Sequence, residues 1–476
     1  MSEHRSKRIG HVTAYCHAGS TGGTERYILE LIRHLAKGGF QSAIWWLQQE
    51  PSAEPVEAGG VRVLGLPTAP MRVDQPPAAL AAAGEQLMQS EKPDVLHFHT
   101  FGLAEAWLAK QARQHKIPCV FTYHSPAWTC RRETLLLWGK APCDGEVRAW
   151  RCAACQSEER LGCGRRAGYA AAAASLLAGW LALPLGRCSL RRRTAFFYDS
   201  WRYGRAVRLF LSSCDLVISC CHWSTPVLLR NGTRPGSLVE CPQGVPQAVA
   251  EAILANPKPG PGGPPEPFTV GYLGRVTPVK GVHILMQGFS MLPDPAARLR
   301  IVGWEPGQEG GYGGQIEQLA KADKRIQLVR KTDLAGALAE YQHFTMLALP
   351  SVWLETGPLT LLEALALGLP VYGTRNLGQL PLLQERGRVV DPNTPEAWRM
   401  ALENGLGLYQ AGHWHEEVMQ ARGHSPIRTM QDVAGEMGVY YQRLAANEPP
   451  SGGPKPLVGA ERAKQTGFTK PVISAD

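Results

Sequence analysis

The sequence predicts an α/β protein of two domains, each with a parallel sheet wrapped by helices. Strand-like apolar runs alternate with helical ones along most of the chain, a pattern typical of parallel sheets with helical crossovers. A segment rich in Pro and Gly, 257–267, interrupts this alternation near the middle. The chain has 476 residues, enough for two or three domains with sizeable cores.

The first domain is expected to span 1–250. Its predicted strands cover 9–16, 43–47, 95–99 and 119–124, and a helix is predicted over 25–37. His97 and His99 form a His-x-His pair, so their side chains share one face of a strand. His99 is a candidate site residue, and we expect no metal there.

A cysteine-rich insert is predicted within this domain, at 129–166. It holds five of the twelve cysteines, namely Cys130, Cys143, Cys152, Cys155 and Cys163. The spacing of Cys152 and Cys155 lets two thiolates bind one metal, and Cys130 and Cys143 would complete a tetrahedron. A small insert with little hydrophobic periodicity needs such a staple. We expect structural zinc rather than disulfides, because a cytosolic chain keeps its thiols reduced. An iron–sulfur cluster would use the same ligands. The alternative to any metal site is a set of reduced, unpaired thiols.

Charge and hydropathy indicate where the protein acts. The N-terminus lacks a secretory pattern and no run resembles a membrane-spanning helix, so we expect a cytoplasmic protein. The net charge of +9 favours an acidic partner. An apolar run at 167–185 is followed by Arg187 and the arginine cluster 191–193. Such a helix with adjacent basic residues can contact an anionic inner membrane face peripherally. The alternative is a buried helix beside a solvated basic loop. Without a recognised module or an aromatic-interleaved basic motif, nucleic acid is not an expected partner.

The second domain is expected at 268–425, after a linker at 251–267. Its predicted strands cover 268–274, 299–303, 326–329, 345–349 and 370–373, with a helix at 282–289. The segment 426–446 is expected to be a helix that crosses back to the first domain. The tail, 447–476, lacks a periodic apolar face, and we expect it to be disordered.

A loop between a strand and a helix carries two cations, Arg275 and Lys280. Lys280 stands at the positive end of the following helix dipole, where a cation is unfavourable by up to about 1 kcal/mol. A diphosphate bound between them would make this placement favourable. The alternative is a pair of solvated loop cations.

Two acids, Glu355 and Glu363, frame the start of a short helix. Thr356 is expected to cap this helix and Pro358 to occupy its first turn, with Gly368 at its end. The free N–H groups of a helix start favour an anion, whereas the acids would accept from neutral hydroxyls. A nucleotide-sugar site needs both; the alternative is a surface helix with two solvated acids.

These motifs together resemble a known family. Gly274-Arg275-x4-Lys280-Gly281 followed by Glu355-x7-Glu363 resembles the retaining glycosyltransferases of family 4, which have the GT-B fold of two Rossmann-like domains facing a cleft. Similar matches occur at 21–26, a glycine-rich loop, at 94–99, at 215–219 and at 242–245, although the family more often has Asn where Gln243 stands. The resemblance covers roughly 9–446.

The resemblance implies roles for individual residues. Arg275 and Lys280 would bind the donor diphosphate and stabilise the departing phosphate. Glu363 would accept from the ribose hydroxyls and Glu355 from hydroxyls of the transferred sugar. His124 matches a family His that reaches the sugar near the reacting centre, although a strand-end His is the alternative. The remaining donor-binding candidates are Gly22, Gly23 and Gly274, which let the backbone approach the ligand, and Thr356, Gly357, Pro358 and Leu359 at the helix start.

The function implied is retaining transfer of a sugar from a nucleotide-sugar, UDP- or GDP-linked, to a glycan or lipid-linked acceptor. Polysaccharide, lipopolysaccharide or glycolipid biosynthesis is the expected setting. No Asp-x-Asp triplet occurs in the chain, so no catalytic metal or other cofactor is expected. Two alternatives remain open at this stage: a nucleotide-sugar epimerase of the same fold, and a non-catalytic scaffold.

Overall fold

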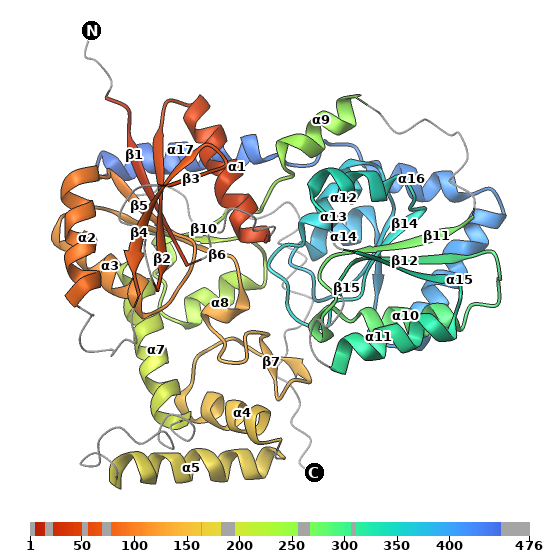
Figure 1. Ribbon diagram of the computed structural model, residues 1–476, viewed down its shortest axis with the longest axis horizontal. Coiled ribbons are helices and arrows are strands. Elements are labelled where there is room, and N and C mark those ends of the chain that lie inside the picture. The colour runs from red at the N-terminus through yellow and green to blue at the C-terminus, as the bar shows by residue number, and fades with distance from the viewer. Residues whose placement is uncertain are drawn as a thin grey trace.

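The computed structural model describes residues 5–14, 22–49, 56–68, 78–162, 164–181, 196–255, 267–305, 311–330 and 332–448. These residues form two α/β units, each built on its own sheet (Figure 1). Several predictions concern residues outside this description: Thr21, Cys163, the arginines at 187 and 191–193, most of the linker, and the tail beyond Glu448.

The first domain has an eight-stranded sheet in the order β10-β9-β6-β5-β1-β2-β4-β3, parallel except for the β3–β4 pair. Its strands are β1 (Arg8–Thr13), β2 (Gln41–Gln48), β3 (Val56–Ala58), β4 (Val61–Pro67), β5 (Val95–Phe98), β6 (Cys119–Tyr123), β9 (Leu216–Ser219) and β10 (Leu238–Glu240). The helices around it are α1 (Gly23–Lys37), α2 (Ala78–Glu91), α3 (Leu103–Gln114) and α8 (Ser224–Arg230). Helix α9 (Gln247–Ala255) follows β10 and packs against the second domain. One apolar core lies on each face of the sheet. Because β1, β5 and β6 run parallel, their carboxyl ends meet at one edge.

A helical layer extends from this domain between β6 and β9. It contains a 3-10 turn (Pro126–Trp128), a short hairpin of β7 (Leu136–Leu137) and β8 (Ala141–Pro142), and the helices α4 (Ala149–Leu161), α5 (Arg165–Leu181) and α7 (Phe196–Ser213). Helix α4 packs against α5 and α7, and α7 also contacts α3. In Figure 1, α4 and α5 project away from the sheet.

The second domain has a six-stranded parallel sheet in the order β13-β12-β11-β14-β15-β16. Its strands are β11 (Thr269–Leu273), β12 (Arg298–Trp304), β13 (Ile326–Arg330), β14 (Met346–Leu349), β15 (Val371–Thr374) and β16 (Arg388–Val390). Its helices are α10 (Val282–Ser290), α11 (Gly311–Ala322), α12 (Leu334–Tyr341), α13 (Leu359–Ala366), α14 (Leu380–Arg386), α15 (Pro395–Gln410) and α16 (Trp414–Arg422). Two apolar clusters fill the space between this sheet and its helices.

The last helix, α17 (Met430–Ala445), returns to the first domain (Figure 1). Thr429 and Asp432 form a capping box at its start. Its apolar face, including Val433, Met437 and Tyr441, is buried in the core beside α1. The chain thus passes between the domains twice, once between β10 and α9 and once before α17.

Candidate donor-binding cleft

A cleft of about 520 Å³ lies between the two domains at the carboxyl ends of their strands. This is the position where open α/β sheets bind ligands, and the volume suits a small-molecule site. The cleft is lined by every residue that the sequence predicts for the donor site: Gly22, Gly23, His124, Gly274, Arg275, Lys280, Glu355, Thr356, Gly357, Pro358, Leu359 and Glu363. The structure therefore brings these residues together; their individual roles stay predictions.

The loop after β11 presents its two cations to the cleft. Gly281 has φ of 69°, and a Cβ there would overlap the carbonyl oxygen of Pro350, so only glycine fits this turn. Lys280 Nζ lies 2.7 Å from Glu355 Oε2. Arg275 is exposed, and within the described parts of the chain no residue pairs with its guanidinium. One cation is thus free for an anion, and the other is held by an acid.

The helix start differs from the prediction at Thr356. Helix α13 begins at Leu359, its N-cap is Pro358, and no side chain caps it. Thr356 lies two residues before the N-cap, too early to reach the free N–H groups, and its hydroxyl instead donates to the carbonyl of His124 across the cleft, at 2.6 Å. The predicted cap is therefore wrong. The predicted end is confirmed, since Gly368 follows the helix with φ of 70°.

Glu363 is buried at the base of the cleft and contacts both domains. Its Oε1 lies 2.9 Å from Arg26 Nη1 on α1, and its Oε2 accepts from the hydroxyl of Tyr341 at 2.8 Å. Burial raises the pKa of Glu363, and the Arg26 charge and the Tyr341 hydroxyl partly offset this rise. The sequence interpretation did not identify Arg26. The sequence does contain an indication of Arg26, because a cation in the first turn of a helix is unfavourable beside the positive end of the helix dipole, as it is at Lys280.

His124 ends a chain of hydrogen-bonded imidazoles that runs into the first domain. His11 Nδ1 lies 3.0 Å from His99 Nε2, and His99 Nδ1 lies 3.1 Å from His124 Nε2. Burial lowers the pKa of His124 and of His11 to about 3, so both rings are neutral near pH 7 and each carries one N–H. The remaining nitrogen of His124, Nδ1, has no partner among the described residues and is left for a ligand.

A second ring, His97, lies beside this chain. Its Nδ1 lies 2.6 Å from the hydroxyl of Tyr441 on α17, and its Nε2 lies 2.7 Å from the hydroxyl of Thr122. His11, His97 and His99 are the one group in the described ranges with three metal-ligand atoms within 4.8 Å of one another. Since both nitrogens of His97 are hydrogen-bonded, its role here is to hold the strands together.

Two aromatic side chains of the β9–α8 connection also join the domains. Trp223 donates from its indole N–H to the carbonyl of Glu355 at 2.8 Å. His222 Nδ1 lies 2.9 Å from the carbonyl of Gly378. Neither residue follows from a sequence motif, because each contact joins segments more than 100 positions apart. They fix the loop of Glu355 against the first domain.

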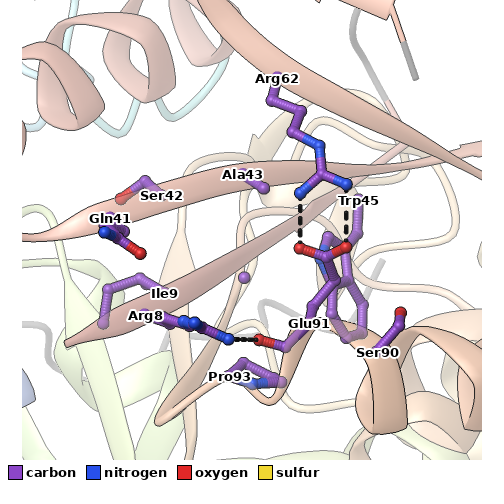
Figure 2. Close-up of a pocket in the computed structure, with 11 residues that line it drawn as sticks. Arg8, Ile9, Gln41, Ser42, Ala43, Trp45, Arg62, Ser90, Glu91 and Pro93 are labelled. Carbon is purple, nitrogen blue, oxygen red and sulfur yellow. Dashed lines mark hydrogen bonds and ion pairs between the residues drawn. The ribbon is translucent and has the colours of Figure 1, made fainter. Parts of the chain in front are cut away.

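A second hollow, of about 410 Å³, lies at the opposite edge of the first sheet (Figure 2). It is found at the amino ends of β1, β2 and β4, with Arg8 and Arg62 at its wall. Arg62 makes a bidentate contact with Glu91, at 2.7 and 3.0 Å, and Arg8 donates to the Glu91 carbonyl at 3.1 Å. Its charged groups are thus already paired, and the location is not where parallel sheets bind ligands.

Comparison with known families agrees with the cleft. The family model described as Glycosyltransferase Family 4 matches residues 21–155, and the one described as Glycosyl transferases group 1 matches residues 267–406. Together they take in more than half of the chain, including both sides of the cleft.

The chain belongs to glycosyltransferase family 4. This confirms the resemblance seen in the sequence. A family member, the D-inositol 3-phosphate glycosyltransferase of Corynebacterium glutamicum, is 32% identical over 190 residues. That match covers 38% of this chain and 44% of the relative, so the chain spans less than half of that protein.

Solved structures show the same fold. The sucrose-phosphate synthase of Thermosynechococcus elongatus superposes with a TM-score of 0.61 at 19% identity, covering 93% of this chain and 100% of that one. HepE of Anabaena, solved in complex with UDP and glucose, superposes with a TM-score of 0.54 at 15% identity, covering 92% and 98%. The predicted fold class, GT-B with two Rossmann-like domains, is confirmed. In the part of the chain that the structure describes, no helix combines the length and apolar character needed to span a bilayer.

Proposed function

We propose that this protein is a retaining glycosyltransferase that moves a sugar from a nucleoside-diphosphate donor to a hydroxyl of a lipid-linked glycan acceptor. The observation that carries the proposal is the cleft, where two cations, two acids and a helix start face one another. A donor presents a dianionic diphosphate and neutral sugar hydroxyls, and the two kinds of group match the cations and the acids respectively. A relative named as a glycosyltransferase, and the structural neighbour HepE solved with UDP and with UDP-glucose, support the same donor class.

The ion pairs in the cleft suggest how the donor enters. Lys280 holds Glu355 at 2.7 Å, and Arg26 holds Glu363 at 2.9 Å. The donor diphosphate competes with Glu355 for Lys280. Hydroxyls of the transferred sugar then bind Glu355 in place of Lys280, and the ribose hydroxyls bind Glu363. The diphosphate then compensates the charge of Lys280, and the neutral hydroxyls provide hydrogen bonds for the carboxylate that Lys280 leaves.

The chemistry follows from the cations. As the bond from the anomeric carbon to the phosphate oxygen breaks, Arg275 and Lys280 stabilise the negative charge that develops on the diphosphate. The acceptor oxygen forms its new bond on the same face, and its proton passes to the departing phosphate. No protein nucleophile is required, and closing the two domains around both substrates fixes their orientation and excludes water.

Helix α7 supports an acceptor held at an anionic membrane. Tyr198, Trp201 and Leu209 are exposed along one stripe of this helix, with Arg202 and Arg205 over the two aromatic rings at 5.6 and 5.2 Å. Aromatic and apolar side chains interleaved with arginines are typical of helices that lie in the interface of an anionic bilayer. The neighbouring helix α5 also leaves Leu177 exposed, while Ala172 and Ser175 on it are buried.

The donor site is tested by calorimetric titration with UDP, GDP and ADP without added metal. One nucleotide should bind selectively, and Lys280→Ala should weaken that binding about 10–100-fold, the effect of a lost charged hydrogen bond. Lys321→Ala, on the exposed end of α11, is the matched control and should leave binding unchanged. Binding that Lys280→Ala does not weaken would show that the diphosphate site is misplaced.

Product analysis separates the transferase from the two alternatives. A transferase releases free nucleotide in proportion to glycosylated acceptor, whereas an epimerase converts the donor without any acceptor. A scaffold does neither. For the acceptor, the protein should sediment with phosphatidylglycerol vesicles but not with phosphatidylcholine vesicles. Trp201→Gln combined with Leu209→Gln should abolish sedimentation; if the native protein ignores both vesicles, the membrane-bound acceptor is ruled out.

A further inference from the structure

The four cysteines of the predicted metal set surround one small cavity of about 30 Å³. They reach it from separate elements: Cys130 follows the 3-10 turn, Cys143 follows β8, and Cys152 and Cys155 lie one turn apart on α4. Residues three apart on a helix share one face, so both α4 thiols point the same way. None of the four forms a disulfide.

The hairpin among these thiols has little regular structure of its own, although Trp128 and Leu135 beside it pack into the core of the first domain. Strands β7 and β8 have two residues each, far fewer than a hairpin needs for stability on its own. The apolar cluster at α4 is small: Ala153, Ala154, Ala172 and Phe196 are buried in it, and Trp138 and Phe197 pack against them. A short hairpin and a small core of this kind are typical of segments that depend on a bound metal.

The electrostatics of the cavity favour a site with negative charge. Arg131, Arg132 and Arg151 line it, whereas Glu146 is its one lining carboxylate. Four thiolates around a divalent ion carry a net charge of about −2. Arg132 is already paired with Glu158 at 2.6 Å and Arg151 with Asp144, so the three guanidinium groups would offset part of this charge. The Trp138 amide already donates to Cys155 Sγ at 3.3 Å, the type of bond that a ligating thiolate accepts.

The size of the cavity indicates a single ion. Among the described residues no three of the four sulfurs lie mutually within 4.8 Å, so the thiols are spaced more widely than the ligands of a bound ion. A tetrahedral site has Zn–S distances of about 2.3 Å, so an ion at the centre would draw the sulfurs inward. The space holds about two water-sized bodies, which suits one ion and not a four-iron cluster.

We propose that Cys130, Cys143, Cys152 and Cys155 bind one structural divalent ion with the thiolate preference of zinc. With four sulfur ligands the ion has no open position and takes no part in transfer. It ties the hairpin to α4. It also anchors the chain six positions after His124, whose carbonyl receives the Thr356 hydrogen bond across the cleft. The ion thus secures the acceptor-side wall of the cleft, independently of the donor chemistry.

The test is metal analysis of the full chain purified under reducing conditions without chelator. The protein should hold about one zinc ion per chain, and Cys130→Ser and Cys152→Ser should each lose it. Cys214→Ala, which removes a buried thiol outside the cavity, should retain it. Because a serine variant can fail to fold, the native protein is also exchanged with cobalt, whose thiolate charge-transfer absorption reports sulfur ligands directly.

Three results would overturn the site: a folded native protein that takes up neither zinc nor cobalt, zinc retained in both serine variants, or cobalt bound without thiolate absorption. If the metal analysis finds iron and acid-labile sulfide in equal amounts, the thiols bind an iron–sulfur cluster and the single-ion site is wrong. Loss of metal with unchanged nucleotide titration would support the proposal, because the site and the donor cleft are separate.

Discussion

Four buried histidines make the first domain sensitive to acid. Burial holds the pKa of His11 and His124 near 3 and that of His97 and His99 well below 6.5, whereas in the unfolded chain all four titrate near 6.5. Between these values the unfolded state binds more protons, so stability falls as the pH drops below 6.5. We expect the free energy of unfolding to decrease by about 1 kcal/mol per histidine between pH 7.5 and 5.5.

Urea unfolding at several pH values checks this expectation. His99→Gln removes one titrating group, so its stability should depend less steeply on pH even if its stability at pH 7.5 is reduced. His415→Gln, at an exposed position, serves as the control and should keep the native slope. Equal slopes for all three proteins would show that these rings do not set the acid response.

The two acids of the cleft should differ in their kinetic effects. Glu363→Gln removes an acceptor for the ribose, so the donor KM should rise about 10-fold or more with a smaller change in kcat. Glu355→Gln acts on the transferred sugar and should lower kcat chiefly. Glu396→Gln, exposed at the start of α15, is the control. Steady-state kinetics with varied donor distinguish these cases, and a Glu363 variant with native KM would contradict the assignment.

For individual residues, the sequence identified those that line the cleft but not the residues with which they form hydrogen bonds and ion pairs. Spacing identifies Glu355 and Glu363 because both lie within one strand–loop–helix unit. The partner of Glu363 is Arg26, 337 positions earlier, and the acceptor for Thr356 is His124, 232 positions earlier. Such pairings depend on how the domains face each other, which no local pattern contains.

Among the elements, the loop after β11 depends on one glycine. Gly281→Ala would force a left-handed backbone on a side chain and overlap Pro350, so we expect a loss of at least about 1–2 kcal/mol of stability and weaker nucleotide binding. Gly407→Ala is the matched control, because this helical glycine of α15 faces open space and alanine should stabilise by about 0.5–1 kcal/mol. Thermal unfolding and UDP titration report both effects; a Gly281→Ala protein as stable as the control would refute the constraint.

Apolar runs predicted the central strands of both sheets better than the edges. Strands β5, β6, β11 and β14 are buried over nearly their whole length, which gives the continuous apolar runs that identify parallel strands. Of the four edge strands, β3, β10 and β16 have three residues each and were not predicted, whereas β13, with five residues, was predicted. A run of three residues carries too little periodicity to be distinguished from a loop.

At the scale of the whole molecule, the first domain depends on the end of the chain. Tyr441 on α17 is fully buried against Phe40 and bonded to His97. Tyr441→Ala should cost about 3–5 kcal/mol through the cavity it leaves, and Tyr441→Phe about 1 kcal/mol through the lost hydrogen bond. Val439→Ala, at an exposed position of the same helix, should change stability by less than about 0.5 kcal/mol. Denaturant unfolding gives all three values, and a Tyr441→Ala protein of native stability would mean that α17 is not part of this core.

The double crossing of the chain has a consequence for how such proteins diversify. Because α17 completes the core that β1 begins, the second domain is topologically an insertion into the first. A single recombination between two related genes would join one protein's β-sheet to another's closing helix and leave a mismatched core. An exchange of the second domain that keeps both cores intact therefore requires two crossovers, one between β10 and α9 and one just before Thr429. Any chimera or split version of this protein has to be cut at the same two places.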